Sequence, residues 1–117
     1  MAMLLQATHE TDSGRIDARL LREPTGFSLA EIARFIGVKV QTLKSNSSAP
    51  SAQPGLAKLV NAWEILQTIF PSDAAIRGWL HHPIRRFKGR TPKWLLESEG
   101  IDAFEALVEE MAAGSHG

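Results

Sequence analysis

The chain has 117 residues, 44% hydrophobic and 22% charged, which is ordinary for a soluble globular protein of one domain, or of two small halves that share one core. Its 13 basic and 13 acidic residues cancel, which argues against non-specific nucleic-acid binding as the main function, because neutralising phosphates requires an excess of Lys and Arg. The absence of cysteine excludes disulfides, cysteine-based zinc sites and thiol nucleophiles. With neither a signal peptide nor an apolar run long enough to span a bilayer, we expect a cytoplasmic protein that does not use a membrane.

Helical spacing of apolar residues dominates the sequence, and no stretch alternates apolar and polar residues long enough to predict a strand. The secondary structure of residues 1–24 is ambiguous. A short amphipathic helix is indicated between Gly14 and Pro24 by three apolar residues, Ile16, Leu20 and Leu21. Thr25-Gly26 then predicts a turn.

Residues 28–46, approximately, have the layout of a helix-turn-helix. Ser28 and Glu31 form a capping-box pattern at the start of the first helix, and Gly37 ends it at a position suited to positive φ. A second short helix is predicted at about residues 40–44. Leu29, Ile32, Ala33 and Ile36 lie on one face of the first helix. Four residues are expected to fill the core between the two helices, Ile32, Ile36, Val38 and Leu43, with the small Ala33 where the helices cross closely.

In a helix-turn-helix the second helix offers its polar side chains to the major groove of DNA. In this chain those side chains are Lys39, Gln41, Thr42 and Lys44. Gln can read adenine through two hydrogen bonds, and Lys can meet phosphate or guanine. The alternative is a helix pair kept for packing or dimerisation, since Asn46 stands where such a unit usually has another apolar anchor.

Residues 45–55 are rich in Ser, Pro and Gly, uncharged, and without a large apolar side chain. This composition indicates an ordered loop or a flexible linker. It is the best boundary in the chain, and it divides an N-terminal region, residues 1–53, from a second region, residues 54–117.

The second region predicts four helices in succession. The first is a long one that Pro71 stops, with Leu56, Leu59, Val60, Trp63, Leu66 and Phe70 on one face. Ser72-Asp73 caps the next, and Thr91-Pro92 starts another, because Thr caps helices and Pro is tolerated in a first turn. Gly100 precedes the last helix, which ends at Gly114. We therefore expect an all-α protein of six or seven helices.

No catalytic constellation emerges from the sequence, which has no Gly-rich phosphate loop and no HExxH motif. His81-His82 precedes Pro83 at a helix end, and adjacent histidines on a helix point to different faces, which favours exposed or capping side chains over metal ligands. We expect no enzyme activity, no cofactor and no metal site.

Charge divides sharply along the C-terminal region. Six basic residues and no acid lie between Arg77 and Lys93, and six acids and no base follow Trp94: Glu97, Glu99, Asp102, Glu105, Glu109 and Glu110. The basic segment 85–90 can contact phosphate with Phe87 stacking on a base, dock on the acidic last helix of another subunit, or remain solvated.

The C-terminal region resembles the toxin-binding domain of Xre-type antitoxins from bacterial type II toxin–antitoxin pairs. The residues that carry this resemblance are Trp79-Leu80, Pro83, Gly89-Arg90-Thr91-Pro92, Leu95-Leu96, Gly100 and Gly114. It covers about residues 56–117, and the Xre-like helix-turn-helix stands upstream in the expected order. The chain departs from the family in having Ile84 where Asn is frequent after the Pro.

The resemblance implies a protein partner, a RES-domain toxin that depletes NAD, and an antitoxin that dimerises, places its C-terminal region at the toxin's active-site mouth and represses its own operon. An acidic last segment can complement the cations of a pyrophosphate pocket. We accordingly expect toxin contacts from Arg85, Arg86, Lys88, Arg90, Glu105, Glu109, Glu110, Met111, Gly114 and His116. The alternative is a helix-turn-helix transcriptional regulator whose C-terminal half serves only dimerisation or ligand sensing.

Overall fold

The computed structural model describes residues 14–114, and within that range it is built from α-helices without a β-strand. Seven α-helices follow one another: α2 (Ala18–Thr25), α3 (Leu29–Ile36), α4 (Val40–Ser45), α5 (Gln53–Ile69), α6 (Asp73–Leu80), α7 (Pro92–Glu99) and α8 (Ile101–Ala112). Two single 3₁₀ turns, Pro50–Ala52 and Arg85–Phe87, lie in the connections. The all-α prediction is confirmed.

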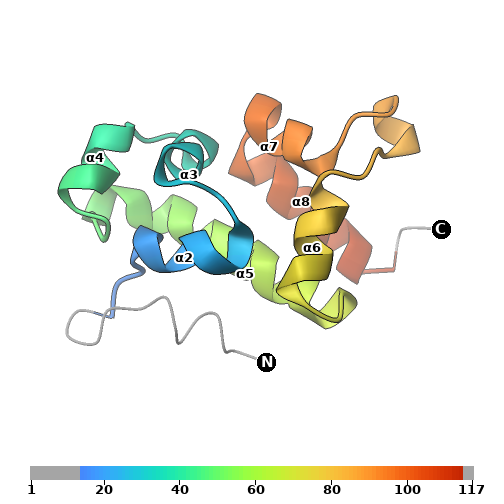
Figure 1. Ribbon diagram of the computed structural model, residues 1–117, viewed down its shortest axis with the longest axis horizontal. Helices are drawn as coiled ribbons and strands as arrows, with labels where there is room; N and C mark the ends of the chain where they lie inside the picture. Colours follow the sequence, from blue (N-terminus) through green and yellow to red (C-terminus); the bar gives the residue numbers. More distant parts are fainter. Residues whose placement is uncertain (1–13, 115–117) are drawn as a thin grey trace.

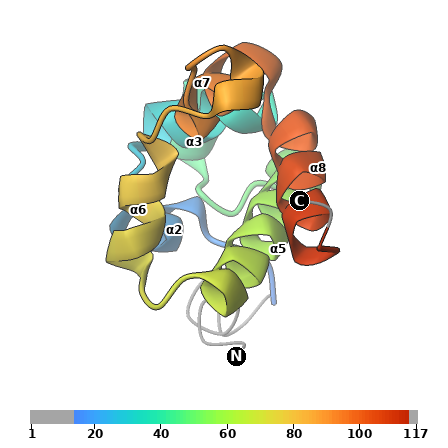
Figure 2. The ribbon, with the colours of Figure 1, turned by 90° about the vertical axis from the view of Figure 1, so that its right-hand side faces the viewer.

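The long helix α5 runs through most of the molecule, whose dimensions are 43 × 29 × 21 Å. Helix α8 lies alongside α5, while α2 and α6 pack against each other on the opposite side (Figures 1 and 2). Helices α3 and α7 meet above them, so that the N-terminal helices contact the C-terminal ones directly. Helix α4 stands at one end of the long axis, and the connection between α6 and α7 stands at the other (Figure 1).

A single apolar core includes residues from both sides of residue 53. Trp63 of α5 is fully buried, and Phe27 meets its ring edge-on, with 6.2 Å between the ring centroids. Phe27 also packs edge-on against Phe35 of α3 at 5.0 Å. Aromatic rings in this geometry contribute beyond the apolar area that they bury. Neither Phe27 nor Phe35 was assigned to the core from sequence.

The first described helix differs from the prediction. It begins at Ala18, because the carboxylate of Asp17 accepts a hydrogen bond from the amide of Arg19 at 2.9 Å. Pro24 lies inside its last turn instead of beyond it, and Ile16 precedes the helix. Leu21 is fully buried but Leu20 is 44% exposed, so the prediction of Leu20 on the apolar face is wrong.

Residues 45–52 pack against the body of the protein. Ser47, Ser48 and Ala49 are buried, and the carbonyl of Ser47 accepts a hydrogen bond from the amide of Ala18. Asn46 accepts one from the amide of Ser48 at 3.0 Å. Of the two sequence-based alternatives for this segment, the ordered loop describes it.

The capping box predicted at the start of α3 is present. Ser28 Oγ accepts from the amide of Glu31 at 3.0 Å, and Glu31 Oε1 accepts from the amide of Ser28 at 2.9 Å. The second carboxylate oxygen of Glu31 lies 2.8 Å from Lys93 Nζ on α7. Glu31 therefore both starts α3 and links it to the C-terminal helices.

The contacts of Glu31 with Ser28 and Lys93 predict that the stability of the fold depends on pH. Burial raises the pKa of Glu31, but the hydrogen bonds from Lys93 and Ser28 together outweigh it and hold that pKa below its ordinary value. A carboxyl group with a lowered pKa in the folded state stabilises the fold above its ordinary pKa, and this contribution is lost as the pH falls through the folded value. We expect Glu31→Gln to destabilise the protein at neutral pH and to have less effect well below pH 4.5. Urea unfolding at both pH values checks this, with Glu23→Gln on the exposed face of α2 as the control; an equal loss at both would contradict it.

Candidate functional site

The connection between α6 and α7 forms a closed loop, residues 84–90, which we call the basic loop. The amide of Ile84 donates to the carbonyl of Arg90 at 2.9 Å, and the amide of Gly89 donates to the carbonyl of Ile84 at 3.1 Å. Lys88 and Gly89 form the tip, both with positive φ, of 60° and 85°. The loop leads into α7, where Thr91 Oγ1 accepts from the amide of Trp94 as the predicted cap.

Two arginines hold the basic loop against the helices beside it. Arg86 forms an ion pair with Glu110 near the end of α8, and its guanidinium lies over the Phe87 ring, 5.4 Å from the centroid. Arg90 lies over the ring of Trp94 at 4.5 Å. The loop thus docks on the acidic last helix of its own chain, whereas the sequence-based alternative was docking on the last helix of another subunit.

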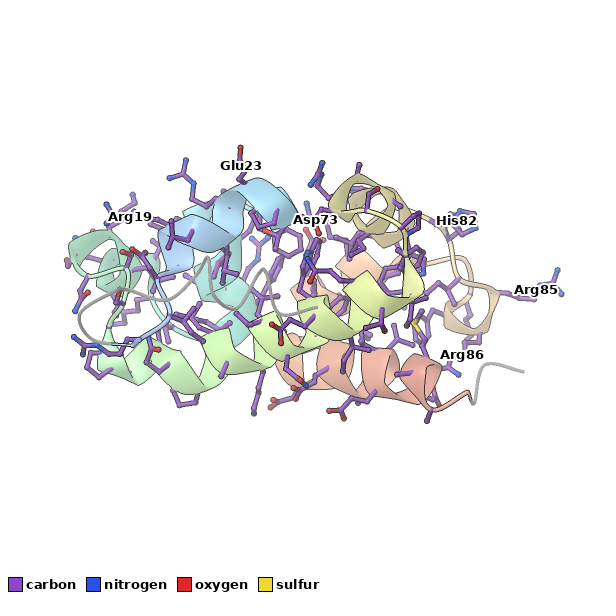
Figure 3. The ribbon with its side chains drawn as sticks, turned by 90° about the horizontal axis from the view of Figure 1, so that it is seen from below. Arg19, Glu23, Asp73, His82, Arg85 and Arg86 are labelled. Carbon is purple, nitrogen blue, oxygen red and sulfur yellow. The ribbon has the colours of Figure 1, made fainter. Side chains whose placement is uncertain are left out.

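Aromatic packing places the loop beside the end of α8. Trp79 of α6 lies between Phe70, which follows α5, and Phe104 of α8, at ring-centroid distances of 5.5 and 6.2 Å. This row fixes the end of α6 relative to α8. Figure 3 shows the result: Arg86 lies next to the last turns of α8, whereas Arg85 points away from the body of the protein.

Most of the acidic side chains after Trp94 have partners within the chain. Lys58 pairs with Asp102 at 2.5 Å, Asn61 donates to Glu105 at 2.9 Å, and Arg34 lies 3.6 Å from Glu97. Glu110 is taken by Arg86. Between residues 14 and 114, no ion pair or side-chain hydrogen bond engages the carboxylates of Glu99 and Glu109, both exposed.

The structure brings the expected toxin-contact residues of the basic loop and of the end of α8 to one end of the molecule, whereas Glu105 lies midway along α8, against Asn61 of α5. Arg85, Arg86, Lys88, Arg90, Glu109, Glu110 and Gly114 are exposed, whereas Glu105 and Met111 are half-buried. Met111 packs against the core. His116 lies outside the described residues.

The expected DNA-contact residues lie at the opposite end. Lys39, Gln41 and Lys44 are exposed on and just before α4, and Thr42 is half-buried. Arg19 of α2, which the sequence reasoning did not select, lines a shallow hollow of about 190 Å³ together with Lys44 and Ser45. Its proximity to α4 could not be read from the sequence, because it depends on the packing of α2 beside the loop that follows α4.

His81 and His82 are both exposed where α6 ends. Among the residues that the structure describes, no three His, Asp or Glu side chains are grouped so as to hold a metal ion. None of the helices between residues 14 and 114 is long and apolar enough to cross a membrane.

Comparison with known proteins gives two matches and one absence. Residues 66–114 match the sequence model of a family described as the antitoxin Xre/MbcA/ParS C-terminal toxin-binding domain. The fold is similar to that of a chain in the crystal structure of the M. tuberculosis MbcT–MbcA toxin–antitoxin complex, with a TM-score of 0.52 and 21% identity. This likeness covers 80% of the present chain and 87% of the other, so it extends beyond the residues that the family model matches. No curated protein sequence matches the chain.

Proposed function

We propose that the chain is the antitoxin of a type II toxin–antitoxin pair, on the premise that residues 66–114 match the family model of antitoxin Xre/MbcA/ParS C-terminal toxin-binding domains. It neutralises a cognate toxin by direct binding and has no enzymatic role of its own. The observation that carries the proposal is the extent of the family match, which includes the basic loop, α7 and α8.

We further propose a RES-type toxin that depletes NAD as the partner, with the end of α8 at its active-site mouth. A pocket that holds the pyrophosphate of NAD must present cations, and carboxylates from the antitoxin complement them. Glu109 is the best placed for this role, because it stands near the end of α8 and no side chain between residues 14 and 114 pairs with it. Glu105 and Glu110 have internal partners that a toxin must first displace.

Charge reversal at Glu109 tests this placement. We expect Glu109→Lys to weaken toxin binding about tenfold, equivalent to about 1.4 kcal/mol, because it sets like charges against each other. Glu23→Lys makes the same charge change on exposed α2, outside the family match, and should leave the affinity unchanged. Isothermal titration of each variant into purified toxin measures the difference. Equal affinities for Glu109→Lys and the unmodified chain would remove Glu109 from the interface.

Operator binding is proposed as a second activity, carried out by a homodimer. The exposed side chains of Lys39, Gln41 and Lys44 at the α4 end favour it, because polar and cationic groups on the second helix are what reads a major groove. Gel shift with the DNA upstream of the gene tests it. Lys44→Ala should weaken binding and reduce its salt dependence, whereas Gln41→Ala should relax sequence preference.

The same surface supports the alternative function, a transcriptional regulator whose C-terminal half serves only dimerisation or ligand sensing. The two functions differ in whether the chain binds the protein encoded by the adjacent gene. We expect the chain to co-purify with the protein encoded by the adjacent gene, as one complex on size-exclusion chromatography. A chain that shifts operator DNA but elutes without that protein would establish the regulator instead.

A further inference from the structure

The six Lys and Arg side chains between residues 66 and 114 divide into two groups. Four have partners within the chain: Arg77 donates to the carbonyl of Pro24, Arg86 pairs with Glu110, Arg90 covers Trp94, and Lys93 pairs with Glu31. The other two, Arg85 and Lys88, engage no partner among the described residues and are exposed. They lie three positions apart on the basic loop.

Lys88 is also the one non-glycine residue between positions 14 and 114 whose backbone has positive φ, with φ 60° and ψ 37°. This left-handed conformation is unfavourable for a residue with a Cβ, and glycine would adopt it without strain. A turn selected only for its shape favours glycine here, as at the neighbouring Gly89. A strained backbone in an exposed loop is typical of a functional position, which indicates a function for the Lys88 side chain.

The loop that carries these cations is braced on both sides. Arg86 attaches it to α8 and Arg90 to α7, while the hydrogen bond from the amide of Ile84 to the carbonyl of Arg90 closes its base. A braced loop loses little conformational freedom when it binds, so its charges contribute more of their interaction to affinity. Arg85 extends from this support into solvent (Figure 3).

We propose that Arg85 and Lys88 form a two-cation contact for a carboxylate-bearing surface on the protein partner, and that Arg86 and Arg90 are positioning residues that hold the loop. The inference rests on the proposed function and specifies which loop residues face the toxin. A protein surface is favoured over nucleic acid by two observations. The loop is at the opposite end of the long axis from α4, and it lies within residues 66–114, which match a family model described as a toxin-binding domain.

Lys88→Gly separates the two roles of this position. It relieves the strained backbone, so the melting temperature should rise by about 2–5 °C. It removes the cation, so the association rate with the purified adjacent-gene protein should fall about fivefold at low salt, with the difference shrinking as salt screens the charges. Arg85→Ala should slow association similarly without raising the melting temperature. Arg22→Ala, which removes an exposed cation from α2 outside the family match, should leave the rate unchanged.

The outcomes are distinct. If the unmodified chain does not bind the adjacent-gene protein, the proposed function fails and this inference fails with it. If it binds and both Lys88→Gly and Arg85→Ala associate at the unmodified rate, the function stands and the two-cation contact is wrong. Weakened binding to a DNA duplex, with protein association unchanged, would also overturn it and assign the loop to nucleic acid.

Discussion

Trp63→Ala is expected to lower the free energy of unfolding by about 3–5 kcal/mol, which is the usual cost of deleting a large buried aromatic side chain. The side chain is fully buried in the middle of α5, and its ring contacts Phe27 from the connection between α2 and α3. Its Nε1 also donates to Asp73 at the start of α6, at 2.9 Å. The substitution therefore leaves a cavity and removes a hydrogen bond at the point where three parts of the chain meet.

Urea unfolding followed by circular dichroism measures the loss. Trp63→Phe should cost less, because it keeps a ring in place and Asp73 retains the hydrogen bond from Gln67 at 3.1 Å. Trp94→Ala is the matched control, since Trp94 is half-buried and packs against Arg90 at the surface. If Trp63→Ala destabilises the protein no more than Trp94→Ala, the Trp63 ring is not at the centre of the core.

Gly55→Ala should destabilise by about 1–3 kcal/mol, the range for overpacking a close contact. A Cβ at position 55 would lie 2.5 Å from Cβ of Ile36 and 3.3 Å from its carbonyl oxygen. The first turn of α5 thus approaches the end of α3 so closely that only glycine fits. The steric cost opposes, and should exceed, the gain of about 1 kcal/mol that Ala usually brings to a helix.

Gly78→Ala is the control, because it is expected to stabilise the protein instead of destabilising it. Gly78 lies within α6, and a Cβ there would have no atom within 4 Å. We expect this variant to gain about 0.5–1 kcal/mol, because alanine restricts the unfolded chain without straining the fold. Thermal unfolding of both variants makes the comparison. If Gly55→Ala also stabilised the protein, the first turn of α5 would not lie in close contact with Ile36 of α3.

The helix starts that carry a Ser or Thr cap were the most predictable part of the fold. Ser28, Ser72 and Thr91 each cap the helix that the sequence assigned to them, because a cap is a contact between residues two or three apart. The interior was less predictable. Phe27 and Phe35 enter the core through packing against residues far along the chain, and Gly55 looked like part of a loop because its neighbour Ile36 is distant in sequence.

The candidate site shows the same division. The positions of its charged side chains along the chain are visible in the sequence, as a run of basic residues followed by acids. The sequence does not show which of these side chains have a partner within the chain. Arg86 and Glu110 are 24 positions apart and meet only because α6 and α8 pack together through Trp79. Within the basic loop and α8, this pairing leaves Glu109, Arg85 and Lys88 as charged side chains that no other described side chain engages.

The two proposed binding surfaces, at α4 and at the basic loop with α8, lie at opposite ends of the molecule (Figure 1). A protein that contacts only one end leaves the other end open to DNA. This arrangement suits an antitoxin that represses its operon while it holds its toxin. We expect the complex with toxin to shift operator DNA as the free chain does.

Co-expression with the adjacent gene tests the central claim most directly. Expression of that gene alone should arrest growth, and simultaneous expression of this chain should restore it, with the two proteins recovered as one complex. The Glu109→Lys variant should require a higher level of expression for the same rescue. An adjacent gene that is harmless alone, or toxicity that this chain leaves unchanged, would contradict the assignment of the chain as an antitoxin.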